Sequence, residues 1–142
     1  MRKIAYLVLT VSLAAIQGIS VASDDKRVPV ELPEMMRQHM LANMRDHLAA
    51  LNEILLHLDS GELEEAAEIA EYRLGMSSLE SHGASHMGKM MPPGMRQAGT
   101  EMHRAASRFA LKAEEGEVLP AYRALSDITS SCVACHSGYR IK

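Results

Sequence analysis

Apolar residues recur at helical spacing in four stretches of the chain. The first stretch begins at Pro33 and Glu34, where a proline suits the first turn of a helix, and it ends at Gly61, a common residue just past a helix C-terminus. Alternating steps of three and four residues define one face of this predicted helix. That face consists of Arg37, Leu41, Met44, Leu48, Leu51, Leu55 and Leu58.

Three further helices are predicted downstream. The second runs from Glu62 to Gly75. After a linker over 76–93, which ends in Pro92-Pro93-Gly94, the third runs to Glu115-Gly116. The fourth begins near Val118 and leads into the C-terminal cysteines. The inward faces of the last two helices are predicted to carry Met95, Ala98, Met102, Ala105 and Phe109, followed by Tyr122, Leu125 and Ile128.

The lengths of the connections indicate how these helices are arranged. Short links join the first helix to the second and the third to the fourth, which favours antiparallel neighbours, and the longer middle linker allows a crossing between the two pairs. We find no alternating strand pattern and no internal repeat. The chain is therefore predicted to be all-α, an antiparallel four-helix bundle with the cysteine motif at its C-terminal end.

The first 22 residues have the organisation of a secretory signal peptide. Arg2 and Lys3 precede an almost uncharged apolar run over 4–21, small residues at Ser20-Val21-Ala22 provide a cleavage site, and charged residues follow at once. An uncleaved membrane anchor is the alternative, but the apolar run is short for a span. We expect a signal peptide over 1–22, one domain over 23–142 and a periplasmic location.

Charge and composition exclude several function classes. Without residues 1–22 the chain keeps 13 basic and 18 acidic residues, a net charge of −5, and it has no basic patch suited to nucleic acid. No later segment is long and apolar enough to cross a membrane. No nucleophile with a matching base, and no acid–base pair, indicates an enzyme.

The only two cysteines form the sequence Cys132-Val133-Ala134-Cys135-His136. Two thiols at this spacing can add to the two vinyl groups of haem, and the histidine that follows can bind the iron. A dithiol redox site normally accompanies an α/β fold, a disulfide this short would stabilise little, and a zinc site would need further ligands. One covalent haem c is therefore the predicted cofactor.

The position of this motif at the end of the last helix resembles the cytochrome c-prime family. The family has a four-helix bundle, a C-terminal Cys-x-x-Cys-His-x-x-Tyr-Arg, matched here through Tyr139 and Arg140, and a first-helix motif similar to Arg37-Gln38-x-x-Leu41-x-x-Met44. The resemblance implies that Arg37, Leu41, Met44, Tyr139 and Arg140 contribute to the haem pocket. It also implies pairing as a homodimer through the first two helices.

The sixth position on the iron is left open by these residues. In the family, the side chain four residues after the arginine decides the state of the iron: a methionine there coordinates it, whereas an aliphatic residue leaves room for small gases. Leu41 holds that position here, yet Met40 and Met44 flank it on the same helix. His47, Met102 and His103 are more remote candidates.

A second group of soft ligands lies within 76–95. His82, His86, Met87, Met90, Met91 and Met95 could suit a copper ion, although a flexible loop often carries such residues without binding metal.

The leading functional prediction is electron transfer through the haem iron to and from redox partner proteins. The alternative is a five-coordinate haem protein that binds NO or CO.

Overall fold

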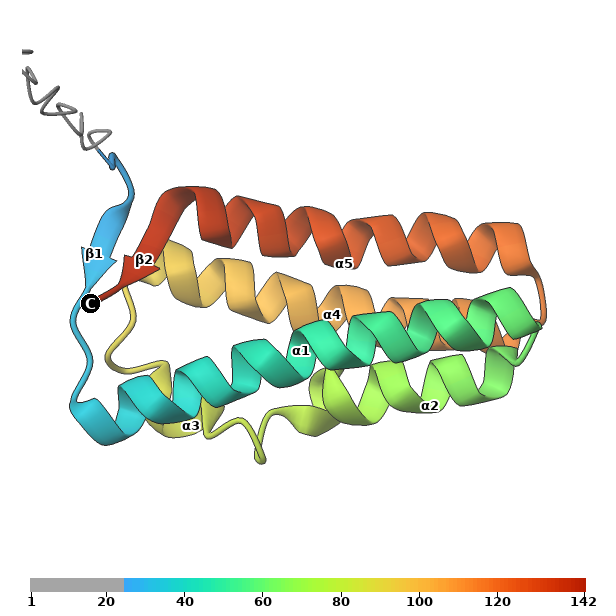
Figure 1. Ribbon diagram of the computed structural model, residues 1–142, viewed down its shortest axis with the longest axis horizontal. Helices are drawn as coiled ribbons and strands as arrows, with labels where there is room; N and C mark the ends of the chain where they lie inside the picture. The colour runs from blue at the N-terminus through green and yellow to red at the C-terminus, as the bar shows by residue number, and fades with distance from the viewer. Residues whose placement is uncertain (1–24) are drawn as a thin grey trace, which may run out of the picture.

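The computed structural model describes residues 25–142, so the predicted signal peptide lies outside the described residues. Four long helices dominate the fold (Figure 1): α1 (Glu34–Ser60), α2 (Leu63–Arg73), α4 (Pro93–Glu114) and α5 (Val118–Gly138). Between α2 and α4 the chain forms a 3-10 turn, η1 (Met76–Ser78), and a short helix, α3 (Ala84–Met87). The all-α prediction is confirmed. None of the described helices is long and apolar enough to span a bilayer.

The predicted ends of the first and third helices agree closely with the structure. Gly61 follows α1 in the left-handed conformation, with φ at 75°, and its N–H donates to the carbonyl groups of His57 and Leu58. A β-carbon disfavours this conformation, so glycine ends the helix at little cost. Pro93 is the first residue of α4, where its missing N–H leaves no hydrogen bond unmade.

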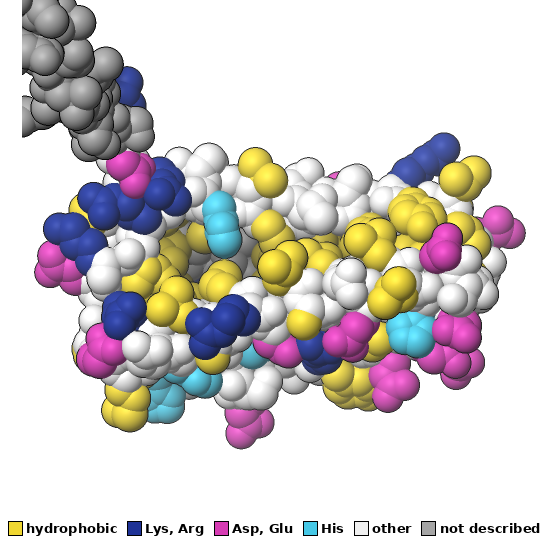
Figure 2. All heavy atoms as spheres, viewed as in Figure 1, with side chains coloured by type: hydrophobic (Ala, Val, Ile, Leu, Met, Phe, Trp, Pro, Cys, Tyr) yellow, Lys and Arg dark blue, Asp and Glu magenta, His cyan; other side chains and the backbone are white. Residues whose placement is uncertain are grey.

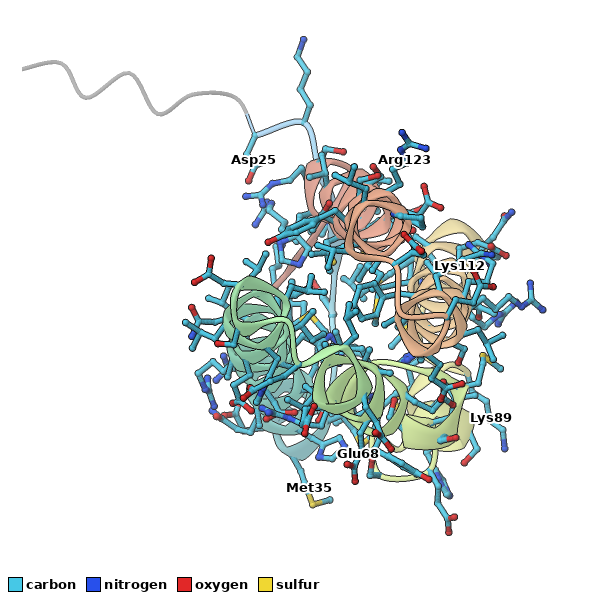
Figure 3. All side chains as sticks on the ribbon, turned by 90° about the vertical axis from the view of Figure 1, so that its right-hand side faces the viewer. Asp25, Met35, Glu68, Lys89, Lys112 and Arg123 are labelled. Carbon is cyan, nitrogen blue, oxygen red and sulfur yellow. The ribbon has the colours of Figure 1, made fainter. Side chains whose placement is uncertain are left out.

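The helices do not all pack equally against one another. The helix α4 packs extensively against α5 and α2, and α2 packs against α1, whereas α1 and α5 have no comparable contact. Buried alanines from several helices, among them Ala66, Ala70, Ala106 and Ala113, allow close approach around Phe109. In the end-on view, side chains fill the space between the helices (Figure 3). Between α1 and α5, which make little contact with each other, the side chains leave a hollow at the surface.

The predicted inward face of the first helix is wrong by about one residue. The buried side chains of α1 are Met40, Asn43, His47, Ala50, Ile54 and Leu58. Leu48 is 71% exposed and Leu55 is 46% exposed, and with Tyr122, which is also exposed, they line an apolar hollow between α1 and α5. The helix carries two adjacent stripes of mainly apolar residues, and packing against neighbouring elements, α2 among them, turns inward the stripe that also includes Asn43 and His47.

A short parallel pairing of two strands was not predicted. The strand β1 (Val28–Val30) runs beside β2 (Tyr139–Ile141), with Val28 opposite Tyr139 and Val30 opposite Ile141. The pairing joins the beginning of the described chain to the residues that directly follow the cysteine motif. It therefore fixes the C-terminal segment at one end of the helices.

Candidate functional site

A cavity of about 610 Å³ lies at the end of the molecule that carries the two strands. Its walls come from α1, α3, α4, the last turn of α5 and β2. Figure 2 shows a hollow on this part of the surface whose floor is formed mainly by hydrophobic side chains. A cavity of this volume is in the range that accommodates a cofactor.

The C-terminal motif borders this cavity. Cys135, His136, Tyr139 and Arg140 line it, whereas Cys132 packs against the alanine-rich core. Both cysteines are partly buried, no disulfide joins them, and burial raises the pKa of each thiol. Residues three and four apart share one face of a helix, so α5 presents the two thiols and the imidazole of His136 on the same side.

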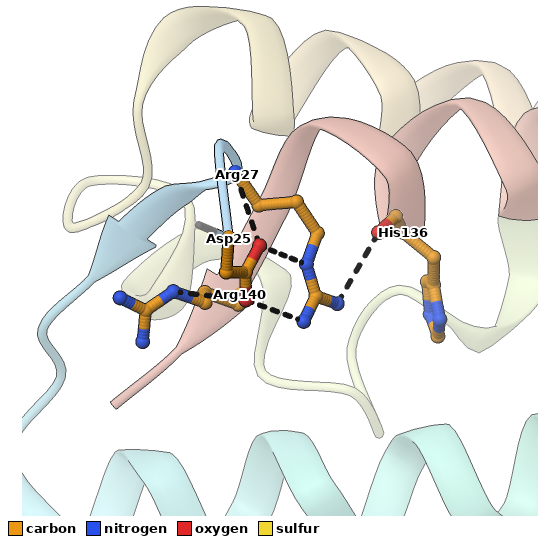
Figure 4. A network of polar contacts seen from close by, with 4 residues as sticks. All are labelled: Asp25, Arg27, His136 and Arg140. Carbon is orange, nitrogen blue, oxygen red and sulfur yellow. Dashed lines mark hydrogen bonds and ion pairs between the residues drawn. The ribbon is translucent and has the colours of Figure 1, made fainter. Parts of the chain in front are cut away.

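His136 lies at the exposed rim of the cavity. Its imidazole points from α5 toward α1, away from the nearby arginines (Figure 4). Its carbonyl group accepts a hydrogen bond of 3.5 Å from Nη1 of Arg27. The ring therefore reaches over the cavity while its backbone is held near the N-terminal segment.

Among residues 25–142, arginines are the only charged side chains that line the cavity, apart from histidine if it is protonated. Arg27, Arg96 and Arg140 contribute to the wall, and no carboxylate in this part of the chain does. Asp25 holds two of them from outside: its carboxylate pairs with Arg27 at 2.8 Å and with Nε of Arg140 at 3.3 Å (Figure 4). Hydrogen bonds from Arg27 lower the pKa of Asp25 to about 2.

The Nε group of Arg140 is buried and makes no hydrogen bond within the described chain, because its approach to Asp25 is poorly aligned. An anionic group that entered this end of the cavity would find donors in place.

The opposite wall comes from α1. Met40, Leu41 and Met44 all line the cavity, so the structure keeps each of the sixth-ligand candidates on this helix near the same space. Arg37 does not line the cavity, because its guanidinium bonds to Glu34 one turn earlier, at 2.8 Å. Of the residues assigned to the pocket by resemblance, Arg37 is thus the one that this structure leaves outside the wall.

The histidine- and methionine-rich linker divides into two groups. His82, Met87, Met91 and Met95 line the cavity, whereas His86 and Met90 are exposed to solvent. With the contributions of α1 and α4, six methionines surround the cavity: Met40, Met44, Met87, Met91, Met95 and Met102. Part of the linker therefore forms a wall of the cavity.

Sequence reasoning missed how three histidines come together. His47, His82 and His103 are each 8% exposed, lie on separate elements and all border the cavity. The sequence contained one signal that could have placed His47 near the cavity: Met40 and His47 are seven residues apart, a spacing that puts both on the same face of a helix. Arg27 and Arg96 were also missed, because neither stands near a recognisable motif.

No protein-family model, curated protein or solved structure matches this chain.

The residues around the cavity fit a porphyrin. The wall is apolar over most of its area and rich in adaptable methionine, which packs well against a large planar group. The arginines could pair with the two carboxylates that haem carries. Cys132 and Cys135 could hold the group covalently, and His136 could supply a nitrogen to its iron.

Proposed function

We propose that the chain is a periplasmic c-type cytochrome that transfers electrons through one haem, with the bundle architecture of the cytochrome c-prime family. The observation that carries this proposal is the position of Cys135 and His136 on an apolar cavity whose wall, as far as the described residues form it, contains arginines and no carboxylate. A dithiol redox site or a disulfide would give no reason for so large a cavity beside the motif.

Each group has a role in this proposal. Cys132 and Cys135 anchor the haem, and His136 binds the iron from the α5 side. Arg27, Arg96 and Arg140 neutralise the propionates. When bound, the haem supplies a reversible one-electron change at its iron, and the apolar wall that excludes water around it tunes the potential.

Electron transfer is preferred because two methionines of α1 reach the cavity opposite His136. A thioether ligand raises the reduction potential and suits a carrier that exchanges electrons with partner proteins.

The second candidate function, binding of NO or CO, is favoured by one observation: Leu41 lies on the same wall, between Met40 and Met44. If Leu41 faces the iron, a small uncharged gas could enter.

Covalent attachment is the first experiment. The full chain is produced in a bacterium that exports it and attaches haem, and haem is then detected on a denaturing gel. We expect Cys132→Ser with Cys135→Ser to abolish the haem-stained band. Ser137→Ala is the matched control, because this exposed hydroxyl bonds only to the Ala134 carbonyl group within α5, and it should leave the band unchanged. A haem-stained band that survives loss of both cysteines would refute the proposal.

Carbon monoxide separates the two functions. Absorption spectra of the reduced protein are recorded with and without the gas. A carrier with a methionine ligand should bind the gas slowly or not at all, whereas an open iron should bind it at once.

A further inference from the structure

The three buried histidines form a compact cluster on the wall of the cavity. His47 comes from α1, His82 from the segment between η1 and α3, and His103 from α4. The ring centroids lie 4.8 Å apart for His47 and His82, 5.4 Å for His82 and His103, and 6.1 Å for His47 and His103. Histidine is not among the residue types that are usually fully buried, so three in contact require an explanation.

The tautomer of His103 follows from its hydrogen bond. Its Nδ1 lies 2.7 Å from the carbonyl oxygen of Leu74. A carbonyl oxygen only accepts, so Nδ1 carries the proton. Burial lowers the pKa of His103, which keeps the ring neutral and leaves Nε2 with a free lone pair.

The tautomer of His82 follows from the hydroxyl group of Ser78. Ser78 is 1% exposed, and its hydroxyl donates to the carbonyl oxygen of Gly75 at 2.7 Å. A hydroxyl has one proton, so toward Nδ1 of His82, 3.3 Å away, it can only accept. Nδ1 of His82 therefore donates, and Nε2 of this ring also keeps its lone pair.

His47 completes the cluster with an unpartnered nitrogen. Its Nε2 is buried and makes no hydrogen bond to any described residue. Leaving a buried polar atom unpaired costs on the order of 1–3 kcal/mol, so such an atom in a native protein calls for a partner that the polypeptide does not supply. All three rings border the same cavity, whose wall contains no carboxylate among residues 25–142.

We propose that His47, His82 and His103 bind one soft or borderline transition-metal cation, of the zinc(II) or copper(I) class. Imidazole suits both ions, and the thioethers that share the cavity suit copper(I). The bonds from Nδ1 of His103 to a carbonyl group and from Nδ1 of His82 to a hydroxyl are the outer contacts that orient metal-binding histidines. None of the three belongs to the cysteine motif, so the metal site would use none of the residues that are proposed to attach the haem.

The spacing of the rings is compatible with one shared ion. Nitrogens at about 2.0–2.1 Å from a tetrahedral ion place ring centroids roughly 5 Å apart. Within residues 25–142, no group of three histidine, cysteine or acidic side chains is arranged to hold a metal ion as the side chains stand. One shared ion therefore requires the rings of His47 and His103, whose centroids are 6.1 Å apart, to move closer together when the ion binds.

Metal titration tests this site. The sample is the mature protein, including any haem attached to it, after a chelator has removed other bound metal ions. Zinc(II) is titrated by calorimetry, and copper(I) is titrated anaerobically against a coloured chelator. We expect one equivalent of at least one ion to bind, and His47→Ala, His82→Ala and His103→Ala each to weaken that binding more than about 100-fold. Ser78→Ala should weaken it by roughly 10–100-fold through the orientation of His82. His86→Ala, a change at an exposed histidine, is the matched control and should bind normally.

A spectroscopic measurement on the unaltered protein covers variants that fail to fold. Binding of the ion should shift the imidazole NMR resonances of His47, His82 and His103, which are buried, and leave those of the exposed His86 unchanged. The inference is overturned if neither ion binds, if binding survives all three substitutions, or if the ion leaves the resonances of the three rings unchanged. Because zinc and copper are counted separately from iron, failure of this site is distinguishable from absence of haem.

Discussion

The hydroxyl group of Tyr139 occupies the space in which a β-carbon on Gly94 would lie. Tyr139 is the first residue of β2, directly after the cysteine motif, and Gly94 is in the first turn of α4. Tyr139 also lines the cavity. The absence of a side chain at Gly94 therefore lets the C-terminal strand lie against α4 and sets the position of one cavity wall.

We expect Gly94→Ala to destabilise the protein by about 1–3 kcal/mol, the usual cost of forcing an extra methyl group into a packed contact. Gly99→Ala on the same helix is the control. A β-carbon there meets no atom within 4 Å, so the substitution should stabilise by roughly 0.5–1 kcal/mol through helix propensity. Urea unfolding measures both changes.

The clash at Gly94 involves the tyrosine oxygen and not the ring. The same β-carbon would lie 3.6 Å from Cζ of Tyr139, which is an ordinary contact. Tyr139→Phe should therefore recover most of the stability lost in Gly94→Ala. Equal losses in both tyrosine and phenylalanine backgrounds would show that the hydroxyl group is not the cause.

Arg73 links α2 to α1 through two carboxylates. Its guanidinium lies 2.6 Å from Oδ1 of Asp46 and 2.6 Å from Oε2 of Glu53, and its hydrogen bonds lower the pKa of Asp46. The three side chains are 28–46% exposed, which limits the energy of the network. Arg73→Gln should cost about 1 kcal/mol in urea unfolding, less in high salt. Arg104→Gln, which breaks only an exposed pair within α4, should change stability by less than about 0.5 kcal/mol.

Acid should destabilise the metal-free protein through the histidine cluster. Burial, followed by the neighbouring His82 and His103, lowers the pKa of His47 from 6.5 to about 4, and the pKa values of the other two are also lowered. The unfolded chain therefore binds protons first as pH falls. Stability is complete above about pH 6.5 and decreases toward pH 4, with a contribution from His47 of at most about 3 kcal/mol.

Asp46 raises the pKa of His47 and Arg73 lowers it, and both effects are smaller than that of burial. Urea unfolding at pH 7.5, 6, 5 and 4 measures this dependence. His47→Gln should flatten it, and His86→Gln should leave it unchanged. If the free energy of unfolding depends on pH equally steeply in both variants, His47 is not the source of the acid destabilisation.

The sixth position on the proposed iron can be assigned by two matched substitutions. Met40 is 4% exposed, Met44 is less buried, and both line the cavity. If one thioether binds the iron, changing that residue to leucine should remove the near-infrared sulfur-to-iron band and open the site to CO. The other substitution should leave the spectrum as it is. A high-spin spectrum insensitive to both would assign the position to neither and favour gas binding.

The local signals of the chain predicted the elements well. Pro33, Gly61 and the Pro92-Pro93-Gly94 run act through backbone geometry alone, so helix ends could be read without knowing what packs where. The spacing of Cys132, Cys135 and His136 likewise determines that these side chains share one helix face, whatever surrounds them.

The rotation of α1 could not be read in this way. Leu48 and Leu55 looked like core residues, yet Ala50 and Ile54 are the fully buried ones. Both stripes contain apolar residues, although the buried one also includes Asn43 and His47, and packing against other elements, α2 among them, selects between the two stripes. The pairing of Val28 with Tyr139 was missed for a related reason, because its partners are more than 100 positions apart and neither segment has a pattern of its own.

Sequence alone thus determined the helical class, the helix boundaries and the spacing of the cysteine motif, since each depends on neighbours within a few residues. The tertiary structure decided which side chains share a cavity. His47, His82 and His103 are 21 to 56 positions apart and have no common motif, and only the packing of α1, α4 and the intervening segment brings their rings together. Contacts of that kind depend on how separate elements pack against one another, and no local pattern in the chain encodes them.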